Sequence, residues 1–314
     1  MPTYNAFVSR TDVEALIPQD VSREIIQNVP QQSAVMRVAR RLPNMITNQR
    51  RLPVLASLVT AYFVNGDTGL KQTTKMAWDN KYINAEELAV IVPIPENVLN
   101  DQNYDIWGEI QPRIVEAFGR AFDQAVLYGT NAPNDWPVNI LTGATTAGNA
   151  VTKGIGADLY EDILGENGTI AKVEEDGYMV TGHIGAIPIR SKLRGLRDAN
   201  GNPLFLRTMQ ERAQYDLDGS PVEFPTNGAV DPAQSLLISG DFSQLVYAIR
   251  QDITYKMLTE AVIQDGSGGI IYNLAQQDMV ALRAVMRLGW QLPNPLNAIN
   301  QVEANRYPFG VLLP

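Results

Sequence analysis

The side chains that could do chemistry are few and far apart in this sequence. The only histidine, His183, has no neighbouring motif that would make it a base or a metal ligand. A lone histidine of this kind is more often structural, because general bases and metal sites need partner residues. Asp216 and Asp218 have calcium-loop spacing, but no later glutamate follows, and calcium takes six or more oxygens. We therefore predict no catalytic, cofactor-binding or metal-binding residues.

Known catalytic motifs are also lacking. The glycine-rich run 266–269 is not followed by the lysine and helix of a phosphate-binding loop, so it is interpreted as a turn. The sequence contains no Walker loop, no G-x-G-x-x-G and no G-x-S-x-G. Without cysteine, thiol catalysis and disulfides are impossible. The charge run Glu174-Glu175-Asp176 is typical of a solvated turn. The sequence thus predicts a protein that is not an enzyme.

Composition excludes further classes of function. The chain has 314 residues, of which 45% are hydrophobic, so it can bury a substantial core in one or two domains. Its net charge of −9 argues against a primary nucleic-acid binder, because phosphate contacts need clustered Lys and Arg. No apolar run is long enough to span a bilayer, and no signal peptide is evident. We expect no membrane partner.

The strongest structural signal is a strand followed by one long amphipathic helix. Residues 88–94 alternate with the period of a strand, and apolar residues then recur every fourth position from Ile106 to Val126. Asp105 is a suitable N-cap and Gly129 a suitable residue after the helix end. The spacing also predicts ion pairs between Glu109 and Arg113 and between Glu116 and Arg120.

The preceding segment, residues 52–92, predicts a long two-stranded hairpin. Its outgoing strand runs from Val54 to Val64, residues 65–69 supply a turn, and the chain returns through Tyr82 and Ile83. An isolated ribbon of two strands is marginally stable in water. Exposed Trp78 and Tyr62 should therefore be covered by another subunit, although folding of the hairpin onto its own core is the alternative.

The second half of the chain alternates short elements with loops. The expected elements are a helix around residues 159–164, a strand at 178–180, a helix at 189–196, a strand at 203–206 and a strand at 280–290. Residues 210–230 are polar and rich in glycine and proline, which predicts a surface loop. One helix face carries Arg190, Arg194 and Arg197, which could contact DNA, contact an acidic neighbour or simply face solvent.

The N-terminal region is expected to be an arm. Residues 1–18 are polar and irregular, and Ser22 could cap a short helix that Pro30 ends. The segment that follows is locally basic within an acidic protein, and such charge asymmetry favours pairing with acidic patches of other subunits. Its basic residues are Arg37, Arg40, Arg41, Arg50 and Arg51.

The strand, corner and long helix resemble the major capsid protein of tailed bacteriophages, which has the Johnson or Hong Kong phage capsid fold. Four further segments resemble that family in the same order. They are LIPQDVSREIIQNVPQQSAVMRVARRLP, GYMVTGHIGAIPIRSKLRGLRDANGNPLF, the pair LDGSPVEFPTNGAV and LLISGDFSQLVYAIRQDITYKML, and DMVALRAVMRLGWQLPNPLNAI. The resemblance covers nearly the whole chain.

The resemblance implies an α+β fold with an axial domain, a peripheral domain with a spine helix, an extended E-loop hairpin and an N-terminal arm. It divides the chain into an N-terminal arm at 1–51, the E-loop at 52–92, the peripheral domain with its spine helix at 93–138, the axial domain at 139–272, and the peripheral return strand and C-terminus at 273–314.

The implied function is a shell protein that assembles with itself, as hexamers and pentamers, into an icosahedral head. Packaged double-stranded DNA would be in non-specific contact, and a portal and possibly a decoration protein would be further partners. Assembly would occur in the bacterial host cytoplasm. The alternatives are an encapsulin-type bacterial compartment of the same fold, or a soluble enzyme with an unrecognised site.

Two expectations concern processing of the subunit. The arm-like sequence begins by about Val21, so we expect no fused scaffold, and a separate scaffolding protein or none. Some family members join an E-loop lysine to a peripheral-domain asparagine with the help of a glutamate. The residue types are present here, but no spacing is diagnostic, and we expect noncovalent shells. The residues concerned are Lys71, Lys75, Lys81, Asn294, Asn297, Asn300 and Glu303.

Overall fold

The computed structural model describes residues 33–64, 70–101, 106–197 and 216–314. The predictions for the first 32 residues, the hairpin turn, the Asp105 cap and the strand at 203–206 lie outside these ranges. The helices are α1 (Ala34–Val38), α2 (Glu96–Asp101), α3 (Ile106–Tyr128), α4 (Ile140–Ala147), α5 (Leu159–Leu164), α6 (Thr169–Glu175), α7 (Ile187–Gly195) and the 3₁₀ turn η2 (Glu303–Asn305).

The strands within the described ranges form four sheets. They are β1 (Arg40–Arg41), β2 (Gln49–Ser57), β3 (Ala77–Asn84), β4 (Glu86–Pro95), β5 (Ala150–Thr152), β6 (Gly182–Gly185), β7 (Asp216–Leu217), β8 (Ser220–Glu223), β9 (Leu237–Gly240), β10 (Val246–Leu258), β11 (Val262–Gln264), β12 (Ile270–Asn273), β13 (Met279–Gln291) and β14 (Phe309–Leu313).

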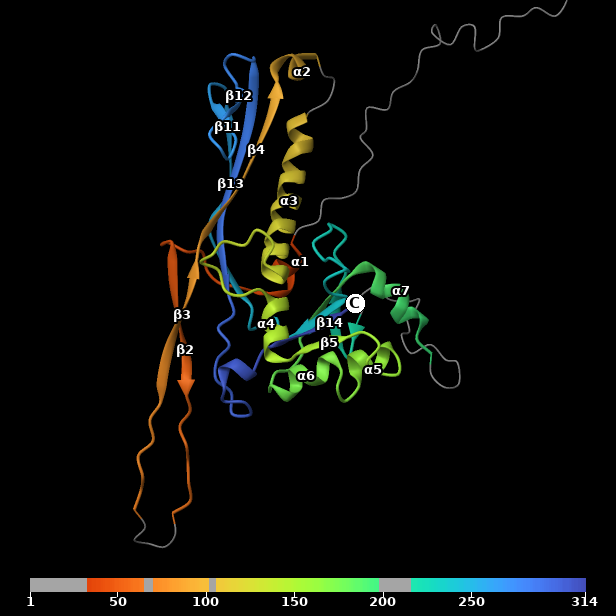
Figure 1. The fold of residues 1–314 in the computed structure, drawn as a ribbon. Helices are drawn as coiled ribbons and strands as arrows, with labels where there is room; N and C mark the ends of the chain where they lie inside the picture. Colours follow the sequence, from red (N-terminus) through yellow and green to blue (C-terminus); the bar gives the residue numbers. More distant parts are fainter. Residues whose placement is uncertain (1–32, 65–69, 102–105, 198–215) are drawn as a thin grey trace, which may run out of the picture.

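The predicted long helix exists as α3 and lies along a four-stranded sheet, as Figure 1 shows. The sheet order is β1-β10-β13-β4, and β13 forms the antiparallel centre between β10 and β4. Gly129 has a φ of +74° and its N–H bonds the Ala125 carbonyl at 3.0 Å, as expected of a helix end. Glu116 forms an ion pair with Arg113 at 2.8 Å, three residues earlier, in place of the predicted pair with Arg120.

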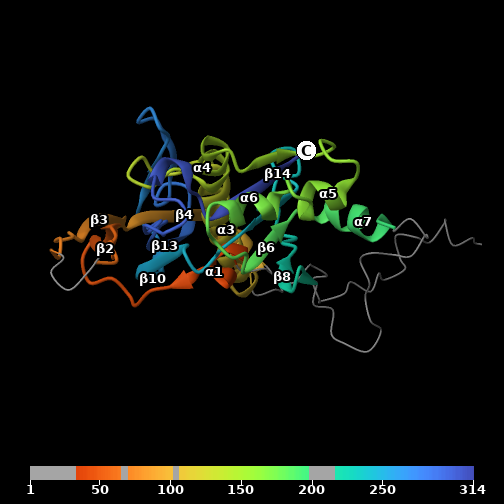
Figure 2. The same cartoon turned by 90° about the horizontal axis from the view of Figure 1, so that it is seen from below.

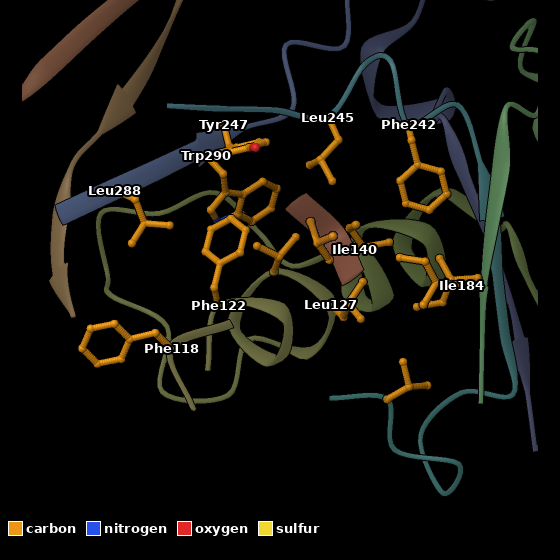
Figure 3. Packing of buried hydrophobic residues seen from close by; sticks show 14 of the residues in the cluster. Phe118, Phe122, Leu127, Ile140, Ile184, Phe242, Leu245, Tyr247, Leu288 and Trp290 are labelled. Carbon is orange, nitrogen blue, oxygen red and sulfur yellow. The ribbon is translucent and has the colours of Figure 1, made fainter. Parts of the chain in front are cut away.

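The main hydrophobic core lies between α3 and this sheet. Figure 3 shows Phe122, Trp290 and Tyr247 at its centre, and the rings of Phe122 and Tyr247 are 6.3 Å apart. Phe122 is 2% exposed and Trp290 is 1% exposed. Side chains two residues apart on a strand point to the same face, so Leu282, Ala284 and Met286 of β13 lie together. They form one apolar surface in the core.

A second body is built on the six-stranded sheet, ordered β5-β14-β9-β6-β8-β7. The helices α5, α6 and α7 pack against it and share a smaller core with Ile163, Ile170 and Ile189. Figure 2, turned by 90° from Figure 1, shows this body on the opposite side of α3 from the β2–β3 hairpin. The mixture of separate helices and mostly antiparallel sheets is an α+β architecture, as predicted.

Each of the two bodies contains strands from distant parts of the chain. β10 comes from the middle of the chain and joins the four-stranded sheet, while β14 at the C-terminus joins the six-stranded sheet. Each sheet therefore contains a strand from a distant part of the sequence. The chain therefore passes from one body to the other more than once.

The predicted hairpin pairs β2 with β3 in antiparallel register, from Gln49 opposite Asn84 to Ser57 opposite Ala77. The sequence predicts that the outgoing strand ends at Val64, but β2 ends at Ser57. The described residues between Ser57 and Ala77 pair in no ladder. β3 passes into β4 with only Ala85 between them, and β4 pairs with β13 and not with the hairpin. At this junction Gly289 is required, because a Cβ there would lie 2.1 Å from the Asn84 carbonyl oxygen.

Three other predictions were wrong. The strand expected at 178–180 begins instead at Gly182, because only 182–185 pair with β9. The expected loop at 210–230 contains the β7–β8 hairpin, whose Leu217 and Val222 are buried against the smaller core. Asp176 is not solvated: it is buried, and its carboxylate accepts bonds from Asn149 Nδ2 at 2.7 Å and from the Tyr307 N–H at 2.8 Å.

Candidate assembly surfaces

The β2–β3 hairpin exposes apolar side chains that its own chain does not cover. Phe63 is 102% exposed, Leu70 90% and Trp78 64%, and Tyr62 is also exposed, as predicted. In Figure 1 the hairpin projects away from both bodies, so its far end has no core of its own to join. Exposed apolar groups gathered on one element mark a surface for another macromolecule.

The base of the hairpin is fixed to the four-stranded body from the C-terminal side. The Leu296 N–H donates to the Leu55 carbonyl at 3.2 Å, and Gln291 Nε2 donates to the Tyr82 carbonyl at 2.8 Å. Lys81 Nζ lies 2.7 Å from Glu303 Oε1, an ion pair at the surface. The base of the hairpin is therefore held against the four-stranded body, and the hairpin extends beyond that body.

The arm enters the described structure at Ser33, where it is bound to α3. The buried carboxylate of Asp123 accepts bonds from Ser33 Oγ and from the N–H groups of Ala34 at 2.8 Å and Val35 at 3.1 Å. Ser33 Oγ also accepts from the Met36 N–H at 2.9 Å, so Ser33 caps α1. Burial raises the pKa of Asp123 to about 6, although these hydrogen bonds and Arg37 favour its charged form.

The basic segment is partly satisfied within its own chain. Arg37 forms an ion pair with Glu223 at 2.6 Å, which links the arm to the six-stranded body. Arg50 donates to the carbonyls of Pro43 at 2.6 Å and Asn44 at 3.0 Å. Arg40 and Arg41 form β1, which pairs with β10. Pairing of these arginines with acidic patches of other subunits stays a prediction.

His183 has a structural role, because it is buried and hydrogen-bonded. It is 0% exposed, its Nδ1 lies 2.8 Å from Ser239 Oγ and its Nε2 lies 3.1 Å from the Leu217 carbonyl. Burial lowers the pKa of His183 to about 4, so the imidazole is neutral at physiological pH. Both ring nitrogens are engaged, which leaves neither free to serve as a base.

The other chemically suggestive residues also have local roles. Asp218 and Gly219, with φ of +50° and +73°, make the turn between β7 and β8. In the turn before β12, Asp265 Oδ1 accepts from the N–H groups of Ser267 at 2.9 Å and Gly269 at 2.7 Å. Among the described residues no group of three His, Cys, Asp or Glu could hold a metal ion. In the same ranges no helix is long and apolar enough to cross a bilayer.

The asparagines near the C-terminus are already bonded within the subunit. Asn294 accepts from Tyr178 Oη at 2.5 Å and donates to the Arg306 carbonyl at 3.1 Å. Asn297 Nδ2 donates to the Asp176 backbone carbonyl at 2.7 Å, and Asn300 Nδ2 donates to the Asn305 carbonyl at 2.8 Å. Within one subunit the structure brings Glu303 to Lys81, and these amides hold the C-terminal loop against α6 and its neighbours.

One exposed surface was missed from the sequence. The β11–β12 hairpin carries Val262, Ile270 and Ile271, which are between 46% and 64% exposed. Figure 1 places it at the end of the four-stranded sheet, far from the β2–β3 hairpin. Its signal was the run of three apolar residues at 270–272, which does not alternate and is too short to separate from a buried strand.

Comparison with known proteins gives one consistent answer. The model of the phage capsid family matches residues 14–303. The major capsid protein of Staphylococcus phage 80alpha is 29% identical over 277 residues, which cover 88% of this chain and 81% of that protein.

Solved structures agree. A structure from Microbacterium phage Oxtober96 has a TM-score of 0.84 at 36% identity and covers 98% of this chain and 100% of its own. The capsid of a native GTA particle, solved with C5 symmetry, has a TM-score of 0.69 at 18% identity over 98% of this chain and 99% of its own, and shows the same fold. Because these matches are to phage and phage-like capsids, the encapsulin alternative is not favoured. The chain belongs to the phage capsid family, has the Hong Kong phage-type capsid fold, and is a major capsid protein that forms the shell of a tailed phage.

Proposed function

We propose that copies of this chain tile a closed icosahedral shell, as hexamers and pentamers, around packaged double-stranded DNA. The observation that carries the proposal is the β2–β3 hairpin, which is fixed at its base and exposes Trp78 on β3 and, further out, Phe63 and Leu70. Such a ribbon gains its stability from a neighbour, since two strands enclose little core. The GTA capsid, which shares the fold, was solved with five-fold symmetry.

The domain assignment that we propose uses the ranges expected from the sequence. We assign 1–51 to the arm, 52–92 to the E-loop, 93–138 and 273–314 to the peripheral domain, and 139–272 to the axial domain. Two strands depart from these ranges, because β10 pairs in the sheet along α3 and β14 pairs in the six-stranded sheet. The chain passes from the six-stranded to the four-stranded sheet between β9 and β10 and returns before β14, and these crossings support coupling of the axial and peripheral parts. A rigid subunit changes its angle to its neighbours as a unit, which lets one sequence occupy several environments in a shell.

The proposed mechanism is burial of interface area without chemistry. A subunit with a net charge of −9 does not attract phosphate. Contact between the shell and the packaged DNA would therefore be non-specific. A scaffolding protein, a portal and possibly a decoration protein would be the further partners, and assembly would take place in the cytoplasm of the bacterial host.

Assembly itself tests the proposal. Purified chain, concentrated at moderate salt, should form closed particles visible by electron microscopy, while a chain with residues 58–76 replaced by a short Gly-Ser turn should stay small. A monodisperse species of 34.6 kDa for the intact chain under all conditions would contradict a shell function. Particles from infected cells should contain DNA and not cargo protein.

We also propose that the shell is noncovalent. Particles boiled in detergent with a reducing agent should release one band near 34.6 kDa. The intramolecular bonds of Asn294 and Asn297 support this, because an amide held by other partners is poorly placed for attack by a lysine. A ladder of multimers would overturn it and would make Lys71, Lys75 and Lys81 the first residues to replace.

A further inference from the structure

The body built on the six-stranded sheet carries opposite charges on two of its edges. We define the basic edge as Lys153, which follows β5, with Lys192, Arg194 and Arg197 on and after α7; all four are exposed. We define the acidic edge as Glu166, before α6, with Glu174 and Glu175 at the end of α6; all three are exposed. Figures 1 and 2 show α6 and α7 on opposite sides of α5.

The basic edge is not neutralised within its own chain. Among the described residues, none of its four members forms an ion pair. Loss of solvent and the neighbouring Lys153 ammonium lower the pKa of Lys192. The guanidinium of Arg197 donates to the carbonyls of Arg194 at 2.9 Å and Leu196 at 3.1 Å, which holds it beside the end of α7. Like charges held together in this way favour the approach of a carboxylate-bearing partner.

The acidic edge is only partly compensated. Glu175 lies 3.1 Å from Lys172 on the same helix, an exposed pair that contributes little. Glu166 and Glu174 form no ion pair in the part of the chain that the structure describes. The edge therefore keeps negative charge that a cationic partner can neutralise.

A second copy of the chain is the partner that supplies both complements at once. Two different and complementary edges on one body make a head-to-tail contact, and such contacts repeat around a closed ring. A nucleic acid would be attracted by one edge but repelled by the other and by the net charge of −9. We propose that the basic edge of one copy docks against the acidic edge of the next copy around each ring of the shell, which rests on the proposed assembly into hexamers and pentamers.

Charge reversal on each edge tests the proposal. K153E/K192E/R194E leaves one cation and three carboxylates on the basic edge, so both edges are then acidic. E166K/E174K/E175K places three cations on the acidic edge, so both edges are then basic. Either variant alone should assemble roughly tenfold or more less efficiently than wild type at low salt, with partial recovery at high salt, because like charges then face each other. The chain with all six substitutions keeps the wild-type net charge and should assemble with itself.

Mixing the two variants gives a sharper readout. One variant has two acidic edges, and the second variant has two basic edges. Subunits of the two variants must therefore alternate around a ring, and only rings with an even number of subunits can close. Six-membered rings should form from the mixture and five-membered rings should not, as judged by electron microscopy with light scattering to follow the rate. Unchanged far-ultraviolet circular dichroism and melting temperature of each free subunit are the control for folding.

The outcomes separate the two proposals. If wild type assembles and either reversal assembles equally well at low salt, or if the sixfold variant is not rescued, the edge-to-edge contact is overturned and the shell function stands. If K153E/K192E/R194E assembles normally but its particles hold less nucleic acid, the basic edge serves the packaged polymer instead. If wild type never assembles, the shell function fails first.

Discussion

The α3 core and the β2–β3 hairpin use the same kinds of side chain in opposite ways. Phe122 lies in the core with 2% of its surface exposed, and Phe63 lies on the hairpin fully exposed. The first stabilises a single chain, because burial of an aromatic side chain contributes about 1.5–3 kcal/mol. The second contributes nothing to a lone subunit and gains its value only against a neighbour. A capsid subunit thus divides its apolar residues between folding and assembly, and each can be tested separately.

The largest expected effect is on the core. Phe122→Ala should lower the unfolding free energy of the free subunit by about 3–5 kcal/mol, because the cavity removes contacts with the rings of Trp136 and Tyr247. Urea unfolding followed by tryptophan fluorescence measures the change. A loss below about 1 kcal/mol would mean that α3 does not depend on this packing.

A pH experiment addresses a buried polar group at the other body. His183 has a pKa of about 4 in the folded protein, against 6.5 for an ordinary histidine, so its contribution to the unfolding free energy is present above pH 6.5 and is lost as pH falls towards 4. The destabilisation caused by His183→Gln should therefore be about 2 kcal/mol smaller at pH 4.5 than at pH 7. Asp123, with its raised pKa, has the opposite pH dependence in this range, but it is common to both proteins and cancels in the difference. Equal destabilisation at both pH values would contradict the assignment of a neutral buried imidazole.

A smaller effect is expected where the arm meets α3. Ser33→Ala removes the cap of α1 and one hydrogen bond to Asp123, and should cost about 1 kcal/mol. Ser33→Thr keeps the hydroxyl and should cost less, so the pair of variants separates capping from simple loss of contact. Unfolding by urea gives both values, and equal costs for the two variants would rule out the capping role.

The smallest effect on the free subunit is expected on the hairpin. Phe63→Ala, the same chemical change as Phe122→Ala, should alter the unfolding free energy by less than about 0.5 kcal/mol, because the ring has no covered surface to lose. The same variant should assemble poorly. A large loss of subunit stability with normal assembly would invert the comparison between the two regions.

Hydrogen exchange extends this comparison to the backbone. Amides from Val54 to Tyr82 should exchange rapidly in free subunits and slowly in shells, while amides of α3 should be protected in both. Equal protection of the hairpin in the two states would show that it is stable without neighbours.

The sequence predicts the long elements of this fold and fails on its short ones. α3 and β13 follow from apolar periodicities sustained over 23 and 13 residues. β6 and the β7–β8 hairpin were misplaced because two to four residues carry no period, and only their partners in the six-stranded sheet define them. Asp176 looked like part of a solvated charge run, but its burial depends on Asn149 and Tyr307, which are distant in sequence.

The assembly surfaces were predictable to the same extent. Exposure of Trp78 and Tyr62 followed from the thinness of a two-stranded ribbon, and the basic face of α7 was visible in its helical spacing. The proximity of Lys153 to Lys192 depends on tertiary packing that no local pattern records.

The single residue between β3 and β4 has a mechanical consequence. A neighbour that pulls on the hairpin pulls β4 along its own axis, and the load reaches the ten-residue ladder from Glu86 to Pro95 against β13. Loaded lengthwise, such a ladder shares the force among all its hydrogen bonds at once, whereas bonds loaded end-on would open one after another. A pull at the edge of a subunit is therefore carried into an uninterrupted ten-residue pairing of its central sheet, so the hairpin acts as a tether anchored in the interior of the molecule.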